Sequence, residues 1–467
     1  MTATDDAALA TGRCPVTGIG PREVSGPKGV PVLGVTPQLA KDPLDFTLAL
    51  QRDHGEVARV DLVPRGYVQL TDPSAIERVL ASNIANYVRG KLYLAFDVFM
   101  GRGLLTLDDA EWRAHRKVVQ PAFTPERVAH GVDRALAALD DAFRSWDRAA
   151  REGRRVDLVR ETMAFSGRLL GEVLVSEDLS RTEQRFTRSV ASALEVIFKN
   201  VSSVEELLLP KWLPTGYQRR KKAARRVFDR IIGRVVAQRR AVGEDGDDVA
   251  GLIMKSDLSD QALTDNLVTM FLAGSETTGL SLMWALYELT RNPAVRREVE
   301  EEVDRVLAGA PPTFDRLDEL PVTRSVVDET LRLYPSVWQF PRDAVQDDEL
   351  AGRHVPAGTT VMVSVFGTHR NPALWENPNS FDPARFRVPA AQRQKFAYLP
   401  FGGGRRQCIG KPLAVAVLVA AVAAVCGRYR FALPYGGESV WPEAFITLFP
   451  PGFPAGGIPV EVSRRDG

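Results

Sequence analysis

Residues able to do chemistry gather in a glycine-rich segment that runs from Phe401 to Gly410. Its three consecutive glycines, Gly402 to Gly404, allow backbone conformations that a side chain would forbid. Cys408 follows them and precedes an apolar run that predicts a helix, so its sulfur is expected beside the positive end of a helix dipole, where a thiolate is favoured. Arg406 lies two residues earlier and suits bidentate pairing with a carboxylate. The segment thus offers a soft anionic ligand next to a planar cation.

Cys408 has two interpretations. Free cysteines are among the most buried residues, so a core thiol in a glycine-rich turn is one of them. The spacing Phe-x-x-Gly-x-Arg-x-Cys-x-Gly favours the other, because it resembles the haem-ligand loop of the cytochromes P450, here of the soluble, bacterial type. The resemblance implies that Cys408 is the proximal thiolate on a haem iron, a ligand that favours O–O cleavage. It also implies that Phe401, Arg406 and Gly410 surround the cofactor.

Trp112 and Arg116 stand at i and i+4 of a predicted helix, so they share one helix face, and both can donate hydrogen bonds. The same spacing fits an amphipathic helix with a half-buried tryptophan and an arginine that reaches solvent. Beside the Cys408 loop, the Trp-x-x-x-Arg pair resembles the family's clamp on the haem propionates. The resemblance implies Lys91 and Arg342 as further propionate partners.

The longest predicted helix, Asp260 to Thr290, ends before Asn292-Pro293 and carries unfavourable residues at its centre. Gly274 costs ~1 kcal/mol against alanine there, and Glu276 and Thr277 add an acid and a β-branched hydroxyl. Such local faults usually mark function, although a packing glycine beside a surface Glu-Thr pair fits as well. The centre resembles the family's oxygen-activating motif. That implies that Gly274 leaves room for the cofactor, that Thr277 hydrogen-bonds dioxygen and that Glu276 helps to relay protons.

Glu329 and Arg332 stand at i and i+3 of a further predicted helix, Val322 to Leu333. An exposed pair of this kind stabilises a protein by only ~0.2 to 1 kcal/mol. Together with Arg385, in Phe-Asp-Pro-Ala-Arg-Phe, the pair resembles the family's buried structural triad. The resemblance implies that loss of one member would leave a buried charge unpaired and hinder haem incorporation.

By resemblance, three segments border the substrate pocket: the aromatic and glycine-rich loop between residues 86 and 109, residues 337–340, and a predicted hairpin tip at residues 444–448. The candidate liners are apolar, and none offers a charged anchor. This favours a hydrophobic substrate, with a terpenoid ahead of a steroid, a fatty acid or a polyketide. The candidate liners are Phe96, Phe99, Val268, Phe271, Val337, Trp338, Phe340 and Phe445.

Composition is that of an ordinary globular protein: 467 residues, 45% apolar, 25% charged, with a net charge of +1. That charge gives no global field for nucleic acid or a membrane. The basic run between Arg219 and Arg226 has no interleaved aromatic residues, which favours a solvated helix face over a nucleic-acid site. Three cysteines form no disulfide framework, which fits a cytoplasmic location. No signal peptide or membrane anchor is expected, because the apolar run Leu413 to Val425 is shorter than the ~20 residues that cross a bilayer.

The elements that must position these residues are mostly helical. We expect helices at 43–54, 260–290 and 322–333, helical structure throughout 125–243, and a hairpin of strands at 57–62 and 67–70. The resemblance implies one cytochrome P450 domain over residues 34–467 after a flexible segment, 1–33. The implied fold is mostly α with a small β-rich lobe, and haem b lies between the Thr277 and Cys408 helices.

The implied reaction is a monooxygenation in secondary metabolism, in which O2 and a substrate give a hydroxylated product and water. Electrons would come from a ferredoxin or flavodoxin with its reductase, attracted to a basic patch at Arg113, Lys117 and Lys411. A monomer is expected. Two alternatives keep the haem: a carrier or sensor without turnover, and a haem-thiolate enzyme that uses peroxide. The pair Glu276-Thr277 favours a monooxygenase over both.

Overall fold

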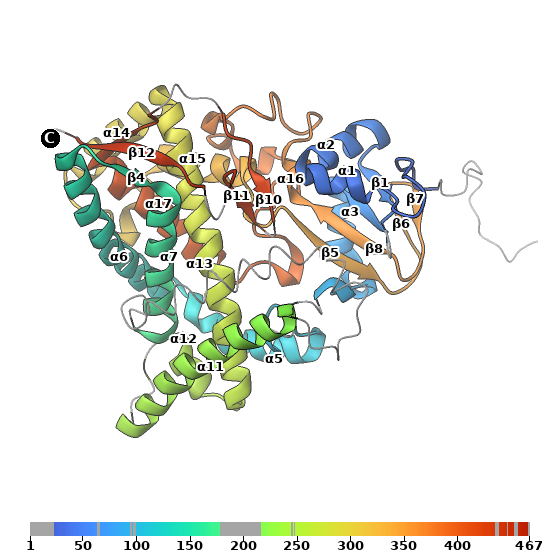
Figure 1. The fold of residues 1–467 in the computed structure, drawn as a ribbon, viewed down its shortest axis with the longest axis horizontal. Coiled ribbons are helices and arrows are strands. Elements are labelled where there is room, and N and C mark those ends of the chain that lie inside the picture. Colours follow the sequence, from blue (N-terminus) through green and yellow to red (C-terminus); the bar gives the residue numbers. More distant parts are fainter. Residues whose placement is uncertain are drawn as a thin grey trace, which may run out of the picture.

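The computed structural model describes residues 23–465 except 63–65, 94–95, 97–99, 178–215, 244–245, 247, 435–438, 446 and 453–455. Figure 1 shows a helical body on one side and a smaller β-rich lobe on the other. The described α-helices are α1 Thr36–Lys41, α2 Pro43–His54, α3 Pro73–Glu77, α5 Asp109–Val119, α6 Pro125–Glu152, α7 Leu158–Val175, α11 Gly216–Val242, α12 Val249–Met254, α13 Asp260–Arg291, α14 Pro293–Leu307, α15 Pro321–Leu333, α16 Val365–His369 and α17 Lys411–Cys426.

Helix α13 forms the centre of the helical body and packs along α7, with α15 and α17 also against it (Figure 1). The Ser259 hydroxyl caps its N-terminus by accepting a hydrogen bond from the Ala262 amide. Its C-terminus is set by Pro293, which disfavours helical structure at Asn292. Helix α17 is apolar on every side and buried, as expected for a core helix. The predicted ends of α2, α13 and α15 are confirmed to within a residue or two.

Five strands of the lobe form a sheet in the order β1-β2-β8-β5-β3. The predicted hairpin is confirmed, because β1 and β2 pair antiparallel from Val57 opposite Leu70 to Val60 opposite Tyr67. Strand β5 carries Phe340 and Arg342, and Phe340 packs against the core of the lobe. The described strands are β1 Val57–Val60, β2 Tyr67–Leu70, β3 Tyr87–Val88, β4 Arg155–Asp157, β5 Gln339–Ala344, β6 Asp348–Leu350, β7 Arg353–Val355, β8 Thr360–Ser364, β9 Tyr429–Ala432, β10 Glu443–Ala444, β11 Leu448–Phe449 and β12 Pro459–Arg464.

The expectation of unbroken helical structure from 125 to 243 is wrong at residues 153–157. Gly153 adopts a left-handed φ of 64° and ends α6, and Arg155–Asp157 then pairs with β12. Residues 178–215 of that segment lie outside the described residues, as do 1–22 of the predicted flexible segment. The mostly helical fold class with a small β-rich lobe is confirmed, while the single-domain assignment stays a prediction. Over the described residues, every helix is too short or too polar to cross a membrane.

Candidate functional site

The glycine-rich loop packs tightly against the lobe. Gly402 and Gly404 both adopt a φ of +65°, and a Cβ on Gly404 would lie 1.8 Å from the carbonyl oxygen of Leu80. Only glycine fits there, because both the conformation and the close contact exclude a side chain. The Cys408 amide donates to the Phe401 carbonyl oxygen at 3.0 Å and closes the loop. The predicted role of the glycines is thereby explained by a specific backbone contact.

The Cys408 side chain is exposed, although it stands at the foot of a buried helix. Helix α17 begins at Lys411, so the sulfur lies three residues before the helix, and the amides of Gly410 and Lys411 stabilise the thiolate. Desolvation by the surrounding chain raises the pKa of Cys408 above its ordinary value, and these amides and Arg116 oppose that rise. The helix end therefore acts in the expected direction without outweighing desolvation, and the thiolate at Cys408 stays a prediction. A bound cation would reverse the balance.

Three arginines meet beside this loop. Burial, followed by the charges of Arg406 and Arg342, lowers the pKa of Arg89 to about 9. Burial and Arg342 likewise lower the pKa of Arg406 to about 10. Over the described residues, no carboxylate lies within ion-pair distance of Arg89 or Arg342, and the buried Nη1 of Arg89 has no hydrogen-bond partner. A buried cluster of cations of this kind fits a ligand that carries carboxylates.

Trp112 and Arg116 come together at the same place, on one face of α5. The Arg406 guanidinium lies 4.4 Å from the Trp112 ring centre, and that of Arg116 lies 5.3 Å from it. Arg116 donates to the carbonyl oxygen of Gln407 at 3.0 Å, next to Cys408. The side chain of Lys91 lies outside the described structure. Arg89, two residues before Lys91, is a cation of the site that the sequence did not reveal. Strand β3, which ends directly before Arg89, places it there.

Helix α13 supplies the other polar groups. The Thr277 hydroxyl donates to the Ala273 carbonyl oxygen at 2.7 Å, and Ala273 itself is exposed in the middle of a buried helix. Gly274 does not share the exposed face of α13 on which Ala273 lies, here called the open strip. A Cβ on Gly274 would lie 2.8 Å from Leu170 of α7. The interpretation of Gly274 as room for a cofactor is therefore corrected. Neighbouring helix positions point ~100° apart, so Ala273 is the small residue on the open face.

Glu276 points elsewhere. It is only 3% exposed, and its carboxylate accepts a hydrogen bond from the hydroxyl of Thr447, in the turn between β10 and β11. Burial is the larger cause of its pKa shift and raises the pKa to about 8, although the Thr447 hydrogen bond lowers it. Glu276 therefore carries a proton at neutral pH. Its partner on the hairpin could not be predicted from the sequence.

These observations test whether the site fits a haem. An exposed sulfur precedes α17, an exposed Ala273 interrupts the buried surface of α13, and these two helices pack against each other. A group of arginines lies beside the sulfur, and of these Arg89 and Arg342 have no carboxylate within ion-pair distance among the described residues, whereas Arg406 has Asp109 at 3.7 Å. A flat group that carries anionic substituents and accepts a sulfur ligand matches this set. The residues present fit a haem.

Comparison with known proteins agrees with this site. The family model described as "Cytochrome P450" matches residues 24–451. The chain is 32% identical to cyclooctat-9-en-7-ol 5-monooxygenase of Streptomyces melanosporofaciens, over 87% of this chain and 89% of that protein. The chain belongs to the cytochrome P450 family. A further relative is pentalenene oxygenase of Streptomyces avermitilis, 27% identical over 91% of this chain and 95% of that protein.

The comparison with solved structures shows the same fold. The crystal structure of a cytochrome P450DA heme domain superposes with a TM-score of 0.85, covers 96% of this chain and 98% of that one, and is 24% identical. As a cytochrome P450, the protein uses haem iron, O2 and an electron-delivering partner.

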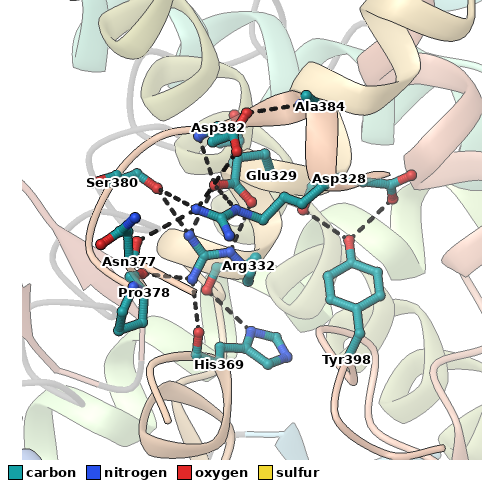
Figure 2. A network of polar contacts seen from close by, with 12 residues as sticks. Asp328, Glu329, Arg332, His369, Asn377, Pro378, Ser380, Asp382, Ala384 and Tyr398 are labelled. Carbon is teal, nitrogen blue, oxygen red and sulfur yellow. Dashed lines mark hydrogen bonds and ion pairs between the residues drawn. The ribbon is translucent and has the colours of Figure 1, made fainter. Parts of the chain in front are cut away.

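A buried ionic network holds the segment that leads to Cys408 (Figure 2). The Arg332 guanidinium donates to both carboxylate oxygens of Glu329, at 2.7 and 2.8 Å, and both side chains are fully buried. Arg385 donates to the same carboxylate at 3.1 Å, as does the Asp382 amide at 2.8 Å. The structure thus brings together the three residues of the expected triad in this cytochrome P450.

His369 extends this network and was missed by sequence reasoning. Burial, followed by the charge of Arg332, lowers the pKa of His369 to about 3, so the ring is neutral. Its Nε2 accepts from the Leu399 amide at 2.9 Å, so its Nδ1 is the atom that donates to the Arg332 carbonyl oxygen at 3.1 Å. Leu399 lies just before the Cys408 loop. The ring therefore links α15 to that loop.

The loop expected to cover the substrate is fastened to α13 by two side chains that the sequence did not reveal. Asp265 accepts from the Arg102 amide at 2.7 Å and also pairs with Arg225 of α11. Asn266 accepts from the Leu104 amide at 3.1 Å. Two adjacent residues of α13 thus bind both the loop at residues 102–104 and helix α11.

The structure separates Trp338 from the other candidate pocket liners. Trp338 packs in a core cluster with Leu44, Phe366 and Leu448, and its indole donates to the Phe445 carbonyl oxygen at 2.6 Å, so it supports the hairpin. Phe99 lies outside the described residues. The assignment of the remaining liners to a pocket stays a prediction. These are Phe96, Val268, Phe271, Val337, Phe340 and Phe445.

We expect Glu329→Gln to destabilise the protein by ~3 to 5 kcal/mol and to lower its haem content, because both arginines would keep buried charges without a carboxylate. Denaturant unfolding and the haem-to-protein ratio measure the two effects. The control is Arg324→Ala, which breaks the half-exposed pair with Asp328 on the same helix and should cost ~1 kcal/mol or less. Equal effects of the two variants would contradict the assignment.

The stability of Glu276→Gln relative to the wild type should depend on pH. Since Glu276 has an ordinary pKa of 4.5 when unfolded and about 8 when folded, the wild type binds one more proton in the folded state between these values. The wild type should therefore lose ~1.4 kcal/mol of stability per pH unit across this window relative to the glutamine variant. Denaturant unfolding at several pH values measures how the difference in unfolding free energy between the two proteins changes with pH. An effect of the glutamine amide that does not depend on pH leaves this slope unchanged. A flat difference would contradict a buried, protonated Glu276.

Proposed function

We propose that the protein is a haem-thiolate monooxygenase that hydroxylates a terpenoid. The balanced reaction converts substrate, O2, two electrons and two protons into a hydroxylated product and water. The observation that carries the proposal is the pair on α13, where Glu276 is buried, with its pKa raised to about 8, and adjoins Thr277, whose hydroxyl donates to the exposed Ala273. A carrier or sensor would not need a proton donor at that position.

In this proposal, Cys408 holds the iron of haem b, and Arg89, Arg116, Arg342 and Arg406 neutralise its propionates. When bound, the haem supplies the one-electron and oxygen chemistry. The residues of the chain do the rest: the Thr277 hydroxyl, which here donates to the Ala273 carbonyl oxygen, would donate to dioxygen in place of that bond, and Glu276, whose pKa is raised to about 8, would hold the proton to be passed on. Its pKa near the working pH suits a group that both gives and regains protons.

The substrate class rests on the candidate liners and the relatives. The liners are apolar, and none carries a charge that would anchor a carboxylate, as a fatty acid would require. The two relatives above are named for the oxidation of cyclooctat-9-en-7-ol and of pentalenene, and both are terpenoid-oxidising enzymes. A terpenoid, as in secondary metabolism, is therefore favoured over a steroid, a fatty acid or a polyketide.

A ferredoxin or flavodoxin is the proposed source of electrons. Arg113 and Lys117 are exposed beside Arg116, and they line a surface hollow with Trp112. Lys411 is exposed at the start of α17, next to the Cys408 loop. This basic surface is complementary to an acidic carrier that must approach the sulfur side of the haem. A monomeric, cytoplasmic enzyme stays a prediction.

Thr277→Ala tests the monooxygenase. We expect the product formed per electron pair to fall roughly tenfold to hundredfold, with peroxide formed instead, because a positioned proton-transfer group is lost. Product and peroxide are measured with a panel of terpenoid hydrocarbons, and fatty acids of similar size serve as controls. The reduced carbon-monoxide spectrum should keep the red-shifted Soret band of thiolate ligation in this variant and lose it in Cys408→Ala. Unchanged coupling in Thr277→Ala would favour a carrier, a sensor or a peroxide-using enzyme.

Charge reversal tests the electron path. The double variant Arg113→Glu and Lys117→Glu should be reduced roughly tenfold more slowly by an acidic ferredoxin at low salt, and the difference should shrink as salt rises. Stopped-flow reduction measures the rate, and spectral titration should show unchanged substrate binding. The control reverses Lys41 and Arg52, exposed cations on α1 and α2 of the lobe. Rates that do not depend on ionic strength would contradict this surface.

A further inference from the structure

The β10–β11 hairpin contacts the proton-bearing part of α13. Thr447, which is only 4% exposed, donates its hydroxyl hydrogen bond to Oε1 of Glu276, and no charged side chain contributes to the pKa shift of that carboxyl. The neighbouring Thr277 hydroxyl is engaged with Ala273 of its own helix. The carboxyl of Glu276 and the hydroxyl of Thr277 are thus held by different partners.

The position of Thr447 is itself well determined. Its carbonyl oxygen accepts from the Phe445 amide at 3.0 Å, which closes the hairpin turn. The Phe445 carbonyl oxygen accepts from the Trp338 indole, and the Leu448 carbonyl oxygen accepts from the Trp284 indole of α13 at 2.9 Å. The turn that presents the Thr447 hydroxyl is therefore fixed from both the lobe and the helical body.

We propose that Thr447 is a positioning residue that holds the Glu276 carboxyl toward the hairpin and so sets how Glu276 gives and regains its proton. The proposal rests on the monooxygenase function, in which Glu276 passes a proton toward the Thr277 side and is then reprotonated from solvent. Phe445, a candidate substrate contact, lies in the same turn, and its amide donates to the Thr447 carbonyl oxygen.

The test compares Thr447→Val, which keeps the shape and removes the hydroxyl, with Thr447→Ser, which keeps the hydroxyl. In Thr447→Val the product formed per electron pair should fall roughly fivefold, the change that one lost hydrogen bond gives in an equilibrium constant. Thr447→Ser should restore it. The matched control is Thr290→Val, which removes a hydroxyl that donates to the Leu286 carbonyl oxygen of the same helix and should leave coupling unchanged.

Two readouts do not depend on turnover. In the infrared difference between wild type and Glu276→Gln, the carbonyl band of the protonated carboxyl should move to higher frequency in the Thr447→Val background, because its hydrogen bond is lost. The Thr447 bond lowers the pKa of Glu276, so in Thr447→Val the pH at which the stability difference levels off should move upward. An unmoved band and an unmoved pH together would overturn the proposal. Both shifts without any change in coupling would keep the contact and refute its role in proton delivery, which separates this failure from failure of the monooxygenase assignment.

Discussion

A fully buried ion pair connects the helical body to the segment that carries Cys408. Glu329 and Arg332 lie on α15, and the Arg332 guanidinium also donates to the carbonyl oxygens of His369 and Pro378, each at 2.7 Å. A buried pair is costly to desolvate, and its attraction repays that cost only when the remaining donors are satisfied. Here backbone carbonyls satisfy them. The pair therefore acts as a clamp on the chain around it more than as a source of net stability.

The clamp reaches Cys408, the proposed haem ligand, through a short series of contacts. The Arg332 carbonyl oxygen bonds the His369 ring, and the ring accepts from the Leu399 amide. The Leu399 carbonyl oxygen accepts from the Gly402 amide, and the Phe401 carbonyl oxygen accepts from Cys408. Each of these hydrogen bonds involves at least one backbone amide or carbonyl group. Burial of the triad is thus tied to the placement of the Cys408 sulfur, which is the physical basis for expecting that loss of one member lowers haem content.

Two buried glutamates in this protein meet opposite electrostatic surroundings. Glu329 has two guanidinium partners, whereas among the described residues the side chain of Glu276 is bonded to the Thr447 hydroxyl alone. A buried carboxyl without a cation keeps its proton, because burial disfavours the charged form. That is the physical reason why the pKa of Glu276 rises to about 8. The same residue type is thus a structural anion in one helix and the proposed proton donor in another.

Motifs whose meaning is local could be predicted from the sequence. The glycines at 402 and 404, the ends of α13 and the i, i+3 pair on α15 depend on neighbouring residues alone. Contacts between distant segments could not be predicted: Arg89 joins Arg342 and Arg406 only after the sheet forms, and Thr447 meets Glu276 across 171 residues of chain. Gly274 was misread for the same reason, since only packing shows that its missing side chain makes room for Leu170.

Two-residue strands such as β10 and β11 are too short to be stable by themselves. The indoles of Trp284 and Trp338 hold the hairpin in place, and Thr447 joins it to Glu276. If Phe445 contacts the substrate as proposed, the substrate therefore acts on a turn that is already joined to the proposed proton donor.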